Sequence, residues 1–168
     1  MAVAVAGGFA SGIVPPNMTN GSTGALLKLF GDINSDNQMV YVEYTCDTVT
    51  ERLSRNMMAW NAAVKPALTP GHVLLTNVVP NPGGAPCFSY QTETIGGNTY
   101  VTAVAITLSV RTEEIDPVTG QFQIETKTLL NVSPRNVFHA WQMASMLELN
   151  RIQPMPPSVQ ALLAGSGS

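Results

Sequence analysis

Two stretches in the second half of the chain decide the fold: residues 100–111 read YVTAVAITLSVR, and residues 122–132 read FQIETKTLLNV. Both alternate with the two-residue period of a β-strand. Between them, residues 116–120 (DPVTG) form a turn, in which proline sets φ and glycine supplies a positive φ. The two stretches therefore predict a long antiparallel hairpin. One face of its first strand carries four apolar side chains: Val104, Ile106, Leu108 and Val110.

Shorter segments before the hairpin predict further strands. They are rich in β-branched and aromatic residues and lie between turn-forming residues. These segments are residues 25–30, 39–46, 73–79 (a buried strand) and 87–93. Residues 52–60 fit either a strand or one face of a helix. We expect an α+β fold with one mostly antiparallel sheet of five to seven strands and a C-terminal helix.

The ends of the chain have a different character. Ser133 and Pro134 are typical of a helix N-cap followed by its first residue, and helical spacing of apolar residues continues to about residue 150. The predicted divisions are a flexible N-terminal segment (1–24), a sheet domain (25–136), a helix (137–152) and a Pro/Gly-rich tail (153–168).

The composition excludes several classes of protein. Charged residues make up 11% of the 168 residues, against roughly 25% in ordinary soluble domains. Either part of the surface is covered by a partner, or the surface is made of Asn, Thr, Ser and Gln. The net charge of −3 and the scattered lysines and arginines exclude binding to nucleic acid through a basic patch. No apolar run has membrane-spanning length.

The chain has two cysteines, Cys46 and Cys87. An even pair in an exported protein permits a disulfide, whereas two buried thiols are the alternative. The spacing does not distinguish them.

No motif indicates catalysis. The sequence has no nucleophile elbow, phosphate loop or dinucleotide fingerprint. Its two histidines, His72 and His139, lack partners at metal-ligand spacing, and we expect the first in a surface turn and the second on a helix face. We therefore expect a protein that is not an enzyme.

Residues 32–43 (DINSDNQMVYVE) match the spacing of an acidic calcium loop. Oxygen ligands would come from Asp32, Asn34 and Asp36 at the first, third and fifth places, and from Glu43 at the twelfth. Asn37 would replace the usual glycine, because asparagine tolerates positive φ. The alternative is a tight Asn/Asp hairpin turn, which the flanking strands favour.

Taken in order, several segments resemble the globular part of a type IV minor pilin or pseudopilin. The resemblance covers residues 25–136 and begins with the Asp-x-Asn-x-Asp turn after the first strand. It continues with a Tyr- and Val-rich strand, the stretch Glu51-Arg52-Leu53-Ser54-Arg55, and a long hairpin that ends in Pro134-Arg135-Asn136.

The resemblance implies a structural subunit of an extracellular filament, at the cell surface or in the periplasm. In that family the sheet packs on a long N-terminal helix, which is not evident before Ala25. Partners would be copies of the same chain or a separate helical pilin chain, unless the C-terminal helix around Trp141 covers the apolar hairpin face. Arg135 and Asn136 would fix the last strand. The alternative function is that of a β-sandwich adhesion or virion structural module.

Overall fold

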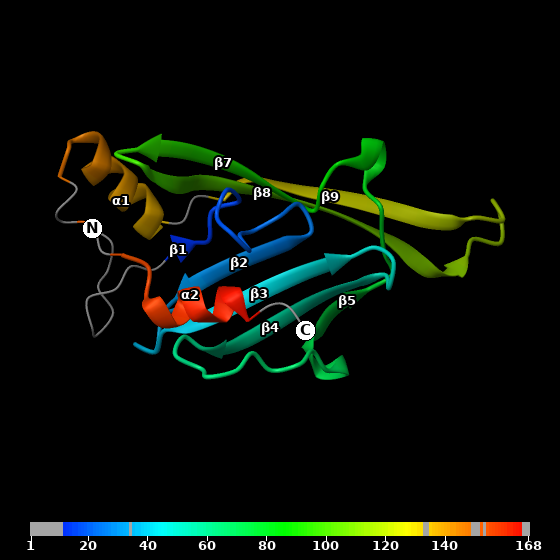
Figure 1. Cartoon of the computed structure of the whole chain (residues 1–168). Helices are drawn as coiled ribbons and strands as arrows, with labels where there is room; N and C mark the ends of the chain where they lie inside the picture. Colours follow the sequence, from blue (N-terminus) through cyan, green and yellow to red (C-terminus); the bar gives the residue numbers. More distant parts are fainter. Residues whose placement is uncertain (1–11, 34, 133–134, 149–151, 153, 166–168) are drawn as a thin grey trace.

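The computed structural model describes residues 12–33, 35–132, 135–148, 152 and 154–165 (Figure 1). Strands dominate and the fold is α+β, as the sequence predicts; two short helices lie near the C-terminus, where the sequence predicted one. The strands are β1 (Gly12–Ile13), β2 (Leu26–Gly31), β3 (Val40–Asp47), β4 (Arg52–Ala59), β5 (Val73–Thr76), β6 (Val78–Val79), β7 (Phe88–Ile95), β8 (Asn98–Ile115) and β9 (Phe122–Val132). The helices are α1 (Arg135–Ser145) and α2 (Pro157–Ala164).

The strands form two antiparallel sheets, so the expectation of a single sheet was wrong. The first sheet is a meander in the order β1-β2-β3-β4-β5. In the second sheet β8 is central: β6 and β7 pair with it, and so does β9. The segment 52–60, which sequence left ambiguous, is strand β4, paired with β3 from Arg52 to Ala59.

The apolar hairpin face packs on the first sheet. Val104 is buried in one cluster with Leu27, Cys46 and Leu53 of the first sheet, and Ile106, Leu108 and Val110 pack against that cluster. The sequence suggested that a separate helical chain, or the C-terminal helix around Trp141, would cover this apolar face. In the structure the first sheet covers it. Two sheets can share a core in this way because each presents one apolar face.

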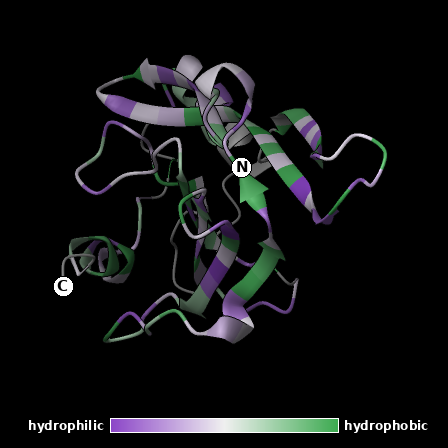
Figure 2. Ribbon diagram, turned by 90° about the vertical axis from the view of Figure 1, so that its right-hand side faces the viewer, coloured by the Kyte–Doolittle hydropathy of each residue, from purple (hydrophilic) through white to green (hydrophobic). Residues whose placement is uncertain are grey.

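Helix α2 covers the opposite face of the first sheet. Its buried Val159, Leu162 and Leu163 pack against Phe30 and Tyr41. In Figure 2 this helix, near the C-terminus, is coloured mainly as hydrophobic. The predicted Pro/Gly-rich tail therefore contains a packed helix, with Pro157 in its first turn, where proline is well tolerated.

Helix α1 packs on the second sheet, where Ala140 and Ala144 contact Tyr100. It ends at Ser145, earlier than predicted. Leu147 has a φ of 64°, and the amides of Leu147 and Glu148 donate to the carbonyls of Ala144 and Met143. These two bonds form a Schellman C-cap without glycine, which stops the helix. Ser133 and Pro134, the predicted N-cap, lie outside the described residues.

The apolar run 73–79 belongs to both sheets. It divides at Asn77, whose φ is 59°, so that β5 joins the first sheet and β6 the second. Val78 is fully buried, but Leu74 and Leu75 are 45% and 42% exposed. The prediction of one buried strand was therefore wrong for β5.

The first sheet also begins earlier than the predicted boundary at residue 25. Strand β1 pairs with β2, and Val14 beside it is fully buried. Residues 12–24 are thus part of the folded body.

Candidate assembly surface

The most exposed regular structure in the described chain is the hairpin at the end of the second sheet. We call residues 111–132 the arm and the rest of the described chain the body. The arm projects beyond the first sheet (Figure 1). Every β9 residue whose side chain is described is exposed. The arm displays seven large apolar side chains: Ile115, Val118, Phe122, Ile124, Leu129, Leu130 and Val132.

The base of the arm is held to the body by Arg111. One of its terminal nitrogens donates to both carboxylate oxygens of Glu51, at 2.9 and 2.7 Å. Its guanidinium lies 4.5 Å from the centre of the Phe122 ring, within cation–π distance. Glu51 lies in the turn between β3 and β4, so this contact joins the two sheets where the arm begins.

Within the arm, β9 pairs with β8 and with no other described strand. Thr126 and Ser109 share a hydrogen bond of 2.7 Å, and Thr128 donates to Thr107 at 3.2 Å. These side chains lie on the face away from the first sheet. The opposite face of β9 carries Glu125, which forms an exposed ion pair of 3.2 Å with Lys127.

No described strand pairs with the outer edge of β9. On β8, the amides of Thr107 and Arg111 donate to Cys87 and Asn77, on the side away from β9. Their opposites in β9, Thr128 and Ile124, are therefore in non-hydrogen-bonded pairs, and their N–H and C=O groups point outward. Thr126, midway between them, has the same orientation. Such an edge is a template for another strand.

A second cluster, inside the body, joins four ionisable side chains beneath α2. The carboxylate of Glu43 accepts hydrogen bonds from the Tyr41 hydroxyl at 2.6 Å and from the Lys65 ammonium at 2.7 Å. The Lys28 nitrogen lies 3.7 Å from it and donates to the Asn20 carbonyl. Lys28, Tyr41 and Glu43 are all buried.

Burial shifts two pKa values in this cluster. Desolvation lowers the pKa of Lys28, and the nearby charge of Glu43 opposes that effect. The pKa of Tyr41 is raised, mainly by burial and then by its bond to Glu43. With its partners engaged, the cluster is suited to holding β2, β3 and the segment after β4 together.

The predicted calcium ligands are not gathered into one set. Asp32 uses both carboxylate oxygens to accept the amides of Asp36 and Asn37, and Asn37 has a φ of 61°. Glu43 instead contacts the two lysines, four residues into the strand that begins at Val40. Asn34 lies outside the described residues.

The described residues include no group of three or more His, Cys, Asp or Glu side chains placed to hold a metal ion. The calcium site stays a prediction, and binding through Glu43 would require its release from two ammonium groups. Calorimetric titration with calcium tests it: a heat of binding that disappears in Asp32→Ala would support a site at this loop.

Two hollows lie in the described part of the chain. One, of about 590 Å³ on the arm, is lined by residues that include Glu113, Glu114 and Asp116. The other is a groove of about 540 Å³ between β1, the β7–β8 turn and α1, and Tyr100 is the one ionisable residue among its described lining residues. His72 lies in a 3₁₀ turn and accepts the Thr69 amide at 2.9 Å, as expected for a turn residue. The side chain of His139 lies outside the described ones.

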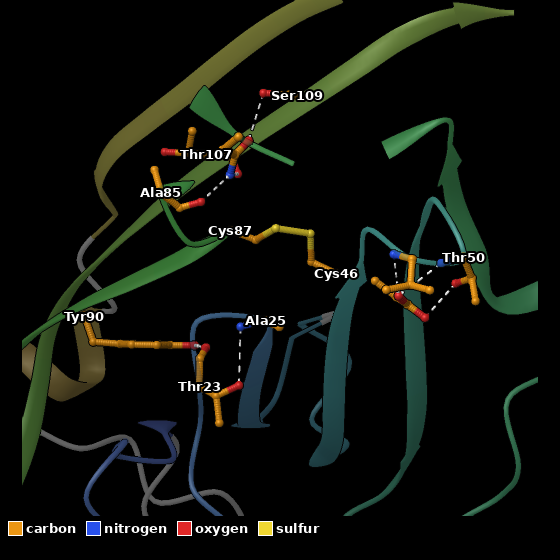
Figure 3. Close-up of a disulfide and its surroundings, with 12 residues drawn as sticks. Thr23, Ala25, Cys46, Thr50, Ala85, Cys87, Tyr90, Thr107 and Ser109 are labelled. Atoms are coloured by element: carbon orange, nitrogen blue, oxygen red, sulfur yellow. Dashed lines mark hydrogen bonds between the residues drawn. A yellow bond between two sulfur atoms is a disulfide. The ribbon is translucent and has the colours of Figure 1, made fainter. Parts of the chain in front are cut away.

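Cys46 and Cys87 form a disulfide, which decides between the two alternatives that the sequence left open (Figure 3). It joins β3 to the residue before β7, and thus one sheet to the other. Asn81 fixes the same connection by donating to the carbonyls of Ala85 and Thr107. A disulfide is consistent with an oxidising compartment outside the cytoplasm. None of the described helices is long and apolar enough to span a membrane.

Comparison with known proteins finds no relative: no family model, no curated protein and no solved structure matches the chain. Sequence reasoning found the strands of the arm and the two cysteines. It missed the exposure of β9 and the ion cluster, because both depend on contacts, or missing contacts, between distant segments.

Proposed function

We propose that this protein is a non-enzymatic structural subunit of an extracellular filament, of the pilus-like or pseudopilus kind. The observation that carries the proposal is the arm, where a strand with five exposed apolar side chains, and with an edge that pairs with no described strand, lies clear of the body. Isolated exposed apolar residues are ordinary, but several of them on one strand with such an edge indicate a surface for a partner.

The chemistry of the chain supports a place outside the cytoplasm. The Cys46–Cys87 disulfide is stable where thiols are oxidised, as at the cell surface, in the medium or in the periplasm. The low content of charged residues also fits a protein whose surface is partly covered in an assembly.

The partners we propose are copies of the chain itself or a separate helical pilin chain. Because the first sheet already covers Val104 and its neighbours, a helical partner would dock elsewhere than on that face. The filament role rests on the order of sequence segments that resemble a minor pilin and on the exposed arm.

A β-sandwich adhesion or virion structural module is the second candidate. The packing of two antiparallel sheets across one core favours it, since the pilin resemblance implied a single sheet on a helix. Both candidates are structural, and they differ in what the chain assembles with.

Native mass spectrometry of the protein, purified with its source assembly, distinguishes them. A small, apolar, helix-forming chain in fixed ratio, or a ladder of copies of this chain, is the result expected for a filament subunit. A monomer that leaves the assembly without any partner would contradict the filament role and favour an adhesion module.

A further inference from the structure

The free edge of β9 is complementary to itself. Its regular ladder with β8 spans residues 124–129, and within it the outward backbone groups belong to Ile124, Thr126 and Thr128. A second strand that pairs with this edge must offer outward groups at the same alternate positions. A second copy of β9, run antiparallel, does so.

We propose that β9 pairs with β9 of a second copy, antiparallel, about a two-fold axis through Thr126. In this register Thr126 faces its own copy, and Ile124 faces the second copy's Thr128, so all three outward positions form hydrogen-bonded pairs. The two second sheets then join into one continuous sheet. This inference rests on the proposed function, because it names the partner of the same surface.

The charges select this register. With the axis at Thr126, Glu125 lies opposite Lys127 of the second copy, and the reciprocal pair forms on the other side of the axis. Opposite charges facing each other across strands stabilise the pairing, whereas like charges oppose it. The two charges are 69% and 82% exposed, so both are accessible to a second chain.

Neighbouring registers fail the same test. An axis one residue earlier places Glu125 opposite itself, and an axis one residue later places Lys127 opposite itself. Both retain the backbone pattern but bring like charges together.

Apolar side chains flank the regular ladder in a matching order. Phe122 and Leu130 lie at its two ends on the face of Thr126, at 38% and 66% exposure. Antiparallel pairing brings Phe122 of one copy to the end of the strand where the second copy carries Leu130. This contact removes apolar surface from water at both ends of the ladder.

A charge-swap cycle tests the register. Sedimentation equilibrium at low ionic strength should show dimers of the full chain with a Kd below about 1 mM. Glu125→Lys alone, or Lys127→Glu alone, should weaken the dimer by about tenfold, because each creates two like-charge pairs. The double variant Glu125→Lys/Lys127→Glu restores opposite charges and should return to within about threefold of the original Kd.

Thr126→Pro provides a second, stronger test. It removes an amide that points outward, so the ladder with β8 is kept, and proline is tolerated at such edges. We expect dimer formation to be lost while the melting temperature falls little. Thr126→Val, which keeps the backbone donor and removes only the hydroxyl bonded to Ser109, is the matched control.

Three results would overturn the pairing. One is a dimer that none of these variants affects, which would leave the filament role intact with a different contact. The second is a chain that stays monomeric up to about 1 mM. The third is protection of the β9 edge amides from hydrogen exchange only in the source assembly, which would mean that a different chain pairs with this edge.

Discussion

Strands β3 and β9 can both be predicted from their sequences, but they have opposite surroundings. In β3, Tyr41 and Cys46 are 0% and 3% exposed, because α2 covers one face and the second sheet the other. In β9, Ile124 and Leu130 are 62% and 66% exposed. Local sequence therefore predicts a strand, while burial depends on which other segments cover it. The body buries its apolar residues within one chain, whereas those of the arm are exposed and accessible to a partner.

The largest effect should come from breaking the body at its covalent link. The disulfide closes a separation of 41 residues, for which the loss of chain entropy predicts about 4 kcal/mol. Cys46→Ala/Cys87→Ala should lower the free energy of unfolding by that amount in guanidinium titration. The same variant should leave association through the arm unchanged once the protein is folded. Equal stability of the variant and the oxidised protein would contradict the role of the bridge.

Breaking the ion cluster should lower the free energy of unfolding by about 3 kcal/mol, because removing one member of a buried ion pair leaves the charge of the other uncompensated. Glu43→Gln keeps the shape and a hydrogen-bond acceptor for Tyr41 but leaves the ammonium of Lys28 buried at 2% exposure. Chemical unfolding measures the loss.

The double variant Lys28→Met/Glu43→Gln is the control for this cluster. It removes the uncompensated buried charge and should recover part of the stability. A double variant no more stable than Glu43→Gln would show that Lys28 is not the residue that depends on Glu43.

A matched pair of leucines compares the two regions directly. Leu27→Ala leaves a cavity in the core and should lower the free energy of unfolding by about 3 kcal/mol. Leu130→Ala on the arm should lower it by less than about 0.5 kcal/mol. Thermal and chemical unfolding of the two variants measure the difference. Similar losses would mean that the arm contributes to the stability of the body, and that the contrast is wrong.

The smallest effect concerns alkaline pH. Burial raises the pKa of Tyr90 to about 12, and its hydroxyl donates to the carbonyls of Thr23 and Leu26. Because the folded pKa exceeds the unfolded value of 10.0, the unfolded chain loses this proton first. The contribution of Tyr90 is complete below pH 10 and is lost as the pH rises toward 12.

Melting temperature against pH, compared between the original protein and Tyr90→Phe, measures this contribution. The decline in stability between these pH values should be smaller in Tyr90→Phe. Identical pH profiles would show that Tyr90 is not responsible.

The elements of the hairpin could be predicted because their signals are local. Residues 122–132 were predicted as a strand and form β9, because alternation and the preceding turn are adjacent in sequence. The number of sheets could not be predicted, because no local pattern distinguishes a strand of one sheet from a strand of another. The division at Asn77 and the end of α1 at Leu147 depend on single residues with positive φ inside apolar stretches.

The candidate surface was only partly predictable for the same reason. The composition suggested a covered surface, but it did not identify which strand lacks a cover. Glu43 fitted a calcium loop by spacing, whereas its contacts in the fold come from Lys28 and Lys65, which lie 15 and 22 residues away in the sequence. The predicted roles of Arg135 and Asn136 fall on side chains outside the described ones.

Hydrogen exchange at two protein concentrations tests the central claim most directly. The amides of Ile124, Thr126 and Thr128 should exchange rapidly in dilute protein and become protected when the protein is concentrated, while those of β3 stay protected throughout. That result would show that the outward amides of the arm are protected by a second molecule, whereas those of the body are protected within one chain. Amides at these three positions that exchange at the same rate at both concentrations would contradict the account.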